Sequence, residues 1–305
     1  MRKIVFVLLA IAVTGVGIAQ KSKPSKSNIL TQVPDLPACC IDHTESPGPK
    51  TVDAAFREVA GTQQFGSLHL EPLPFELEDP KGTMTMFTCT DGQPGNGYLI
   101  PAQAKSNNWL IVIQEWWGLN DHIKQEADKF YAALDGKVNV LAVDLYDGKV
   151  AATVDSAQKL IRAALGSKRK ETILQGALNF AGNNANVYSV GWCFGGMMSL
   201  QTAIMGGSKM KGCIMYYGTP EKNDARIAQI KCDVLGIFGT QDRSIPNETV
   251  DKFAEQMKTA GKKFTLERYD APHAFANPSN PGYNKQYGDD AFGKSVAFLK
   301  TRIKG

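Results

Sequence analysis

The sequence contains no Gly-x-Ser-x-Gly motif and only four histidines among its 305 residues. Because that motif carries the nucleophile of the serine α/β-hydrolases, its absence argues against a serine enzyme of this type. No internal repeats occur, and no dense basic stripe stands out among 34 Lys and Arg against 30 Asp and Glu. This near-neutral balance argues against nucleic acid as a partner.

The first residues have the pattern of a secretion signal. Arg2 and Lys3 precede an apolar run over 4–12, and small residues stand just before Gln20, where signal peptidase needs them. The run is short for a membrane span, and no cysteine follows it that could carry a lipid anchor. An uncleaved N-terminal anchor is the alternative. We expect residues 1–19 to be a signal peptide, the protein to be exported (periplasmic or secreted), and no stable membrane association after cleavage.

Six cysteines in an exported chain raise the question of disulfides. Cys213 and Cys232 lie in apolar runs typical of buried free thiols. Cys39 and Cys40 are adjacent and cannot easily bond each other, but either could reach Cys89 or bind a partner outside the chain. The sequence leaves this pairing open, and it leaves the oligomeric state open as well.

The composition changes near residue 80. Residues 20–80 are rich in proline, serine and glycine, with one short helical candidate at 51–60, and we expect an extension that packs loosely on the domain. His43 and His69 in this extension lack ligand-like spacing, so we expect no metal site. Residues 81–305 should form one domain.

Apolar runs and helical patterns alternate along this domain. An expected hairpin comes first, and near-continuous apolar strands follow, which favours a mostly parallel sheet covered by helices on both faces. A parallel sheet that begins with an antiparallel hairpin is the arrangement of the α/β-hydrolase fold, and this is the fold class we predict. The expected strands are 83–89, 98–101, 109–113, 138–143, 187–190, 211–217, 232–238 and 264–269, and the expected helices are 121–134, 153–165, 170–180, 197–205, 247–260 and 284–303.

A cysteine stands where one of these strands meets its helix. Gly191-x-Cys193-x-Gly195 is the cysteine form of the nucleophile elbow, in which a sharp turn lifts one side chain out of the sheet. The residues two before and two after it must be nearly free of side chain, and glycine meets that need. The turn also places the thiol at a helix N-terminus, which favours a thiolate. The alternative is a buried cysteine beside a glycine turn.

Two further polar residues follow other strands. Asp242 comes after 232–238 and His273 after 264–269, and active groups gather at the carboxyl ends of parallel strands. Nucleophile, acid and histidine in this chain order is the α/β-hydrolase order. We therefore predict Cys193 as nucleophile, His273 as base and Asp242 as the group that orients the imidazole. Otherwise Asp242 is a turn residue and His273 a packed loop histidine.

The oxyanion hole of such an enzyme needs two backbone N–H groups. One is that of Phe194, directly after the nucleophile, and the other lies in the loop after 109–113, where Trp116 is the natural candidate.

Several segments together resemble the dienelactone hydrolase family, whose members are carboxymethylenebutenolidase-like. The segments are Gln114-Glu115-Trp116-Trp117-Gly118-Leu119-Asn120, Asp144-Leu145-Tyr146, Gly191-Trp192-Cys193-Phe194-Gly195-Gly196, Gly239-x-x-Asp242 and His273-Ala274-Phe275. The resemblance implies a cofactor-free Cys-His-Asp triad that hydrolyses the ester bond of an enol-lactone. It also implies that Glu115 contacts the resting thiol and takes its proton as substrate enters. Burial between two tryptophans would raise the pKa of this carboxyl group, which suits proton exchange with sulfur.

The sequence departs from the family at the substrate carboxylate. The family's type enzyme holds that carboxylate with two arginines, one of them shortly after the catalytic histidine. Here Ala274-Phe275-Ala276-Asn277 follows the histidine, and no arginine follows Tyr146 until Arg162. We expect Trp116, Trp117, Tyr146, Phe275 and Asn277 to line a largely apolar, aromatic pocket instead.

These features together predict a cysteine hydrolase that acts on a small ester, lactone or thioester through an acyl-enzyme. It should need no cofactor and no metal. The alternative is a non-catalytic or redox-linked ligand-binding protein on the same fold.

Overall fold

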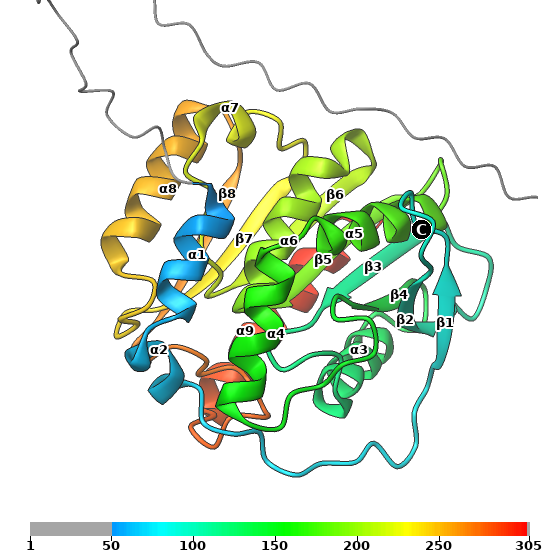
Figure 1. The fold of residues 1–305 in the computed structure, drawn as a ribbon. Helices are drawn as coiled ribbons and strands as arrows, with labels where there is room; N and C mark the ends of the chain where they lie inside the picture. Colours follow the sequence, from blue (N-terminus) through cyan, green and yellow to red (C-terminus); the bar gives the residue numbers. More distant parts are fainter. Residues whose placement is uncertain (1–50, 304–305) are drawn as a thin grey trace, which may run out of the picture. The chain divides into compact units, whose positions relative to one another are not determined.

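The computed structural model describes residues 51–303, so the expected signal peptide, Cys39, Cys40 and His43 lie outside the described residues. Eight strands form one sheet in the order β1-β2-β4-β3-β5-β6-β7-β8 (Figure 1). The strands are β1 (Thr83–Phe87), β2 (Gly95–Ile100), β3 (Asn108–Ile113), β4 (Asn139–Asp144), β5 (Asn186–Trp192), β6 (Met210–Tyr216), β7 (Asp233–Gly239) and β8 (Phe264–Tyr269).

The sheet is parallel except at its first edge. β1 pairs antiparallel with β2, and β2 pairs antiparallel with β4, while every other neighbouring pair is parallel. The central strands β3, β5, β6 and β7 are almost wholly buried, as strands covered on both faces must be. The predicted α/β-hydrolase fold class, including its antiparallel start, is confirmed.

Helices cover both faces of the sheet. Figure 1 shows α5 and α6 in front of the sheet and α9 behind it. Phe130 of α3 packs against Phe292 of α9 with ring centroids 4.8 Å apart, so α3 lies on the same side as α9. The main helices of the domain are α3 (Asp121–Ala133), α4 (Val154–Leu165), α5 (Arg169–Phe180), α6 (Phe194–Met205), α7 (Asp224–Ile227), α8 (Asn247–Thr259) and α9 (Lys285–Lys300), with a 3-10 turn η1 (Gly207–Lys209) before β6.

The described part of the N-terminal extension does not pack loosely. Thr51 caps α1 (Val52–Ala60) and Thr62 caps α2 (Gln63–Leu68), each through its side-chain oxygen. Phe56 and Phe65 are 1% exposed and belong to the same hydrophobic core as the sheet. The composition of residues 51–69 does not indicate this packing against the core, because the apolar residues that make the contacts are few and widely spaced.

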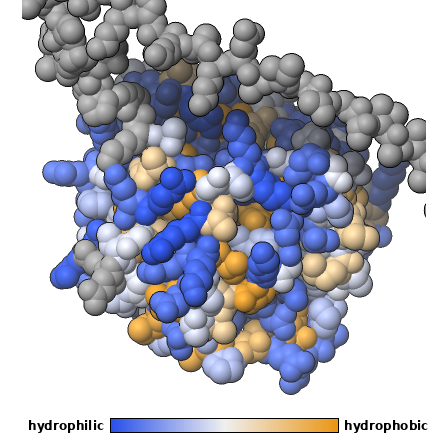
Figure 2. Space-filling view, in the orientation of Figure 1, coloured by the Kyte–Doolittle hydropathy of each residue, from blue (hydrophilic) through white to orange (hydrophobic). Residues whose placement is uncertain are grey.

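On the face that carries α1 and α4, small hydrophobic patches lie among hydrophilic residues (Figure 2). Within residues 51–303, no helix has the length and apolar character needed to cross a bilayer. Cys89, Cys193, Cys213 and Cys232 form no disulfide with one another.

The order in which the chain adds strands to the sheet changes side at β3. After β3 it continues to β4 on one side, and then it returns to β5 on the other side of β3. Ligands of open α/β sheets bind outside the carboxyl ends of the strands at such a switch point. The loops that follow β3 and β5 carry Glu115 and Cys193, so the topology places both at this position.

Candidate active site

Cys193 occupies a strained turn between β5 and α6. Its backbone has φ 54° and ψ −114°, a conformation that side chains rarely adopt, and its side chain is buried. The turn needs glycine on both sides. A Cβ atom on Gly191 would overlap the carbonyl oxygen of Gly195, and one on Gly195 would overlap the carbonyl oxygens at the end of β3. The Gly-x-Cys-x-Gly spacing therefore produces the expected elbow, with the thiol at the N-terminus of α6.

His273 and Asp242 form a buried pair beside this turn. His273 Nδ1 donates a hydrogen bond of 2.6 Å to Asp242 Oδ2, and the other carboxylate oxygen accepts from the backbone N–H groups of Ser244 and Ile245. Asp242 holds Nδ1, and the Nε2 atom of His273 has no hydrogen-bond partner among the described residues. Burial lowers the pKa of His273, but the charges of Asp242 and Cys193 outweigh burial and raise it.

The thiol itself is held in a dry environment. Burial raises the pKa of Cys193, and the neighbouring imidazole of His273 opposes that rise. The sulfur therefore depends on a nearby base to lose its proton.

Glu115 lies in the loop after β3 and is also fully buried. Ser279 Oγ donates a hydrogen bond of 2.9 Å to its Oε1 atom, and the Asn277 amide donates to Oε2. Burial raises the pKa of Glu115 to about 7, although both hydrogen bonds oppose the rise. The expected raised pKa is thus present. Asn277, expected in the pocket wall, serves this carboxylate.

The resting thiol has a partner that the sequence did not indicate. His69, just after α2, places its Nε2 atom 3.5 Å from Cys193 Sγ. Its Nδ1 atom donates to the carbonyl oxygen of Phe65 at 2.8 Å, so Nε2 is the nitrogen without a proton in the neutral ring. Burial, and then the charge of His273, lower the pKa of His69 well below its ordinary value, which keeps the ring neutral.

His69 was missed because its spacing to other polar residues was uninformative. A usable signal did exist: Thr62 can cap a helix, and Phe65 and His69 stand four residues apart, on one face of such a helix.

Aromatic side chains lie close to the elbow, where the Trp116 ring centroid is 4.6 Å from that of the His69 ring. Trp116 contacts Trp117 edge to face, and Tyr146 stacks on Phe194. The expected lining residues Trp116, Trp117, Tyr146 and Phe275 are all buried, and Arg162 is exposed on α4. The structure therefore offers no arginine clamp from that position.

Three neutral donors in this wall have no hydrogen-bond partner among the described residues. They are the indole N–H of Trp116 and the hydroxyl groups of Tyr146 and Tyr217. Tyr217, which follows β6, was not predicted as a site residue; its ring is tilted against that of His273, with centroids 4.9 Å apart. Buried donors of this kind normally have partners, so these three can bind oxygen atoms of a substrate.

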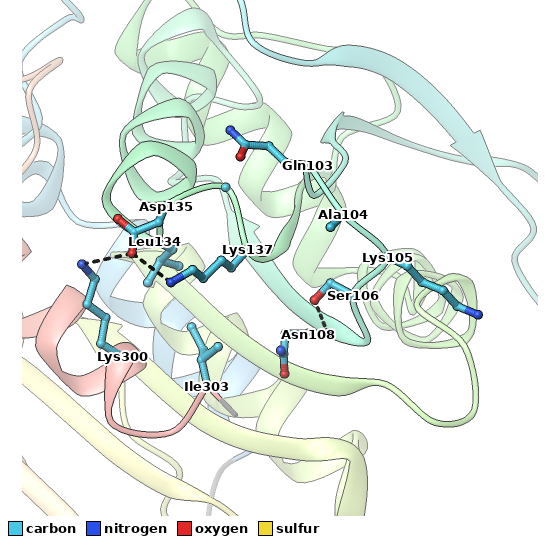
Figure 3. A pocket seen from close by; sticks show the side chains of 11 residues that line it. Gln103, Ala104, Lys105, Ser106, Asn108, Leu134, Asp135, Lys137, Lys300 and Ile303 are labelled. Atoms are coloured by element: carbon cyan, nitrogen blue, oxygen red, sulfur yellow. Dashed lines mark hydrogen bonds and ion pairs between the residues drawn. The ribbon is translucent and has the colours of Figure 1, made fainter. Parts of the chain in front are cut away.

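A hollow of about 570 Å³ lies at the opposite end of the sheet (Figure 3). It is lined by residues that precede β3 and β4, such as Ser106 and Lys137, and by Lys300 at the end of α9. None of the predicted site residues lines it. The buried cluster at the carboxyl ends of the strands remains the candidate active site.

Comparison with known proteins agrees with this geometry. The family model described as "Dienelactone hydrolase family" matches residues 96–303. The chain belongs to the dienelactone hydrolase family. It is accordingly a carboxylic ester hydrolase, and the predicted resemblance is confirmed.

Relatives within the family are distant. "Protein usf" of Aquifex pyrophilus is 27% identical over 224 residues, which cover 68% of this chain and 96% of the relative. A protein of Aquifex aeolicus named "Putative carboxymethylenebutenolidase" is 25% identical over 225 residues, with the same coverage of 68% and 96%.

Solved structures support the fold. A dienelactone hydrolase-like promiscuous phosphotriesterase from metagenomic libraries superposes with a TM-score of 0.63 at 21% identity, covering 73% of this chain and all of that one. An esterase of Pyrococcus furiosus gives a TM-score of 0.57 at 15% identity, covering 77% and 99%.

Proposed function

We propose that this family member hydrolyses small esters, lactones or thioesters with Cys193 as nucleophile, His273 as base and Asp242 as the orienting carboxylate. One observation carries the proposal. A strained elbow presents a thiol at a helix N-terminus, beside an imidazole whose Nδ1 atom donates to a buried carboxylate. Nucleophilic acyl transfer uses these three groups, and the sulfur and one ring nitrogen of His273 lie within 4.8 Å of each other.

The reaction proceeds in two halves. Nε2 of His273 takes the proton of Cys193, and the sulfur attacks the substrate carbonyl carbon to give a tetrahedral intermediate. The carbon–oxygen bond to the leaving group then breaks, and His273 returns the proton to the departing oxygen. Water attacks the resulting thioester with His273 again as base, which releases the acid and restores the thiol.

The backbone N–H groups of Phe194 and Trp116 are the proposed oxyanion donors. Phe194 is the first residue of α6, so its N–H has no partner within the helix and the helix dipole adds to its effect. Removal of one such donor in other enzymes costs about 10²–10³ in rate.

Glu115 is the proposed proton acceptor that primes the thiol. A carboxyl group whose pKa is about 7 can exchange a proton with sulfur near neutral pH, whereas an ordinary glutamate would be too weak a base. In the resting arrangement the sulfur contacts His69 and the carboxylate contacts Asn277 and Ser279. Priming by Glu115 therefore requires the carboxylate or the thiol to rotate when substrate enters.

The wall of the site indicates a neutral substrate. Besides His273 Nε2, its unpartnered groups include the Trp116 indole N–H and the hydroxyls of Tyr146 and Tyr217, and these three provide donors without positive charge. Neutral donors suit the oxygens of an uncharged ester or lactone better than a carboxylate, which favours arginine. We therefore propose substrates without a carboxylate next to the scissile bond.

The test is a panel of aryl esters and lactones, each neutral or bearing a carboxylate, assayed with the wild-type protein and with Cys193→Ala. Cleavage of neutral members should vanish in Cys193→Ala, while Cys213→Ala, which alters another buried thiol, should retain it. Full activity in Cys193→Ala would refute the mechanism, and a strong preference for the carboxylate-bearing members would refute the substrate class.

A further inference from the structure

Three metal-ligating side chains converge at the elbow. Cys193 Sγ and one ring nitrogen each of His69 and His273 lie within 4.8 Å of one another, and all three residues are buried. His69 comes from the segment after α2, Cys193 from the end of β5 and His273 from the loop after β8. The ester hydrolysis proposed above uses Cys193 and His273 and assigns no role to His69.

The distance between sulfur and nitrogen fits a tetrahedral ion. Zinc–sulfur bonds are about 2.3 Å and zinc–nitrogen bonds about 2.0–2.1 Å, so a tetrahedral angle separates the two ligand atoms by about 3.6 Å. Cys193 Sγ and His69 Nε2 are 3.5 Å apart. These two ligands need almost no movement to share one ion.

Both imidazoles are also held in the tautomer that a metal requires. His69 Nδ1 donates to the Phe65 carbonyl oxygen, and His273 Nδ1 donates to the Asp242 carboxylate. Metal-binding histidines almost always donate their second ring nitrogen to a carbonyl or carboxylate group, which fixes the ring and leaves the other nitrogen free to coordinate. Each Nδ1 atom is therefore occupied, and each ring coordinates through Nε2 once that atom carries no proton.

We propose that His69, Cys193 and His273 form a binding site for a borderline-soft divalent metal ion, with Zn²⁺ as the ion whose geometry fits. Two imidazoles and one thiolate supply three ligands, and a water molecule or a substrate oxygen completes the tetrahedron. On binding, the protons on the thiol and on His273 Nε2 pass to the solvent, and sulfur–metal and nitrogen–metal bonds replace the S–H and N–H bonds. If the proposed hydrolysis is correct, the bound ion also inhibits it, because it occupies the nucleophile Cys193 and the base His273.

Binding is measured on the full chain, reduced and free of metal, by titration with Co²⁺ as a spectroscopic substitute for zinc. The wild-type protein should develop a thiolate-to-cobalt charge-transfer absorption that saturates at one equivalent of Co²⁺. The absorption should disappear when Zn²⁺ displaces the Co²⁺. Cys193→Ala should abolish this absorption, and His69→Gln should weaken Co²⁺ affinity at least tenfold, because a ligand is lost. This readout does not depend on any esterase activity.

Matched controls separate this site from other thiols and histidines. His122→Gln changes another histidine that bonds a backbone carbonyl, that of Leu73, and Cys213→Ala changes another buried thiol. Both should leave affinity within twofold of wild type. A double variant, Cys39→Ser with Cys40→Ser, should also retain the absorption.

The proposal is overturned if the charge-transfer absorption survives in Cys193→Ala, if it depends on Cys39 and Cys40, or if His69→Gln binds as tightly as wild type. Should His69→Gln fail to fold, alkylation of the wild-type protein decides the matter. One equivalent of Zn²⁺ should slow iodoacetamide labelling of Cys193, mapped by peptide mass spectrometry, and a chelator should restore it. Unchanged labelling would overturn the proposal.

Discussion

Replacing Glu115 by glutamine should remove the loss of stability that this one group causes between pH 4.5 and pH 7. The pKa of this buried carboxyl group is about 7 in the folded protein against an ordinary value of 4.5. One pKa unit corresponds to about 1.36 kcal/mol, so the difference of about 2.5 amounts to about 3 kcal/mol.

The sign follows from where the proton is held. Below pH 4.5 the folded and unfolded chains both carry a protonated Glu115, and the group does not affect their balance. Between pH 4.5 and 7 the unfolded chain releases the proton while the folded protein keeps it, so the free energy of unfolding falls as pH rises. Above pH 7 both states are ionised, and the loss of about 3 kcal/mol stays constant.

Glutamine cannot ionise, and whatever it costs in hydrogen bonds to Asn277 and Ser279 is independent of pH. The assay is reversible urea unfolding of the wild-type protein and of Glu115→Gln at pH 4 to 8. The difference between their free energies of unfolding should change by about 3 kcal/mol across this range, in favour of the variant at higher pH. Parallel curves would show that Glu115 titrates normally and would refute the burial argument.

Three other substitutions test the site. Asp242→Asn should lower kcat for ester cleavage roughly a hundred- to ten-thousandfold with little change in KM, because the imidazole loses its orienting carboxylate; steady-state kinetics measure this, and an unchanged kcat would contradict the role. Gly195→Ala should lower the thermal midpoint strongly, because its Cβ overlaps the backbone at the end of β3, whereas Gly293→Ala on α9 meets no atom within 4 Å and should be neutral or stabilising; equal midpoints would argue against a tight elbow. Phe65→Ala should cost about 3–5 kcal/mol of stability by urea unfolding and speed iodoacetamide labelling of Cys193, and unchanged labelling would show that α2 does not shield the thiol.

Local chemistry made much of this fold predictable. The strand at 264–269 was predicted with its observed bounds, and the other strands lie within a few residues of their predicted ranges. Buried parallel strands are recognisable as apolar runs, and Gly-x-Cys-x-Gly became informative because it stood at the end of one, in chain order with Asp242 and His273. The polar residues after β7 and β8 could be named because parallel topology brings the strand ends together.

Contacts made by irregular segments were not predictable. His69 meets Cys193 across 124 positions of sequence, and Ser279 reaches Glu115 from a loop that has no periodic pattern. The strand predicted at 211–217 includes Tyr217, although the backbone of Tyr217 leaves β6 with φ 37°. In each case the position depends on how a loop or a short helix packs, and neither hydrophobic periodicity nor spacing between polar residues reports that packing.

Detection of the acyl-enzyme tests the central claim most directly. The wild-type protein is mixed with an aryl acetate, quenched in acid within the first turnovers, and digested for peptide mass spectrometry. The account predicts an acetyl group on the Cys193 thiol, formed together with a burst of phenol and absent from Cys193→Ala. Acetylation of another residue in step with turnover, or a full burst in the Cys193→Ala protein, would contradict it.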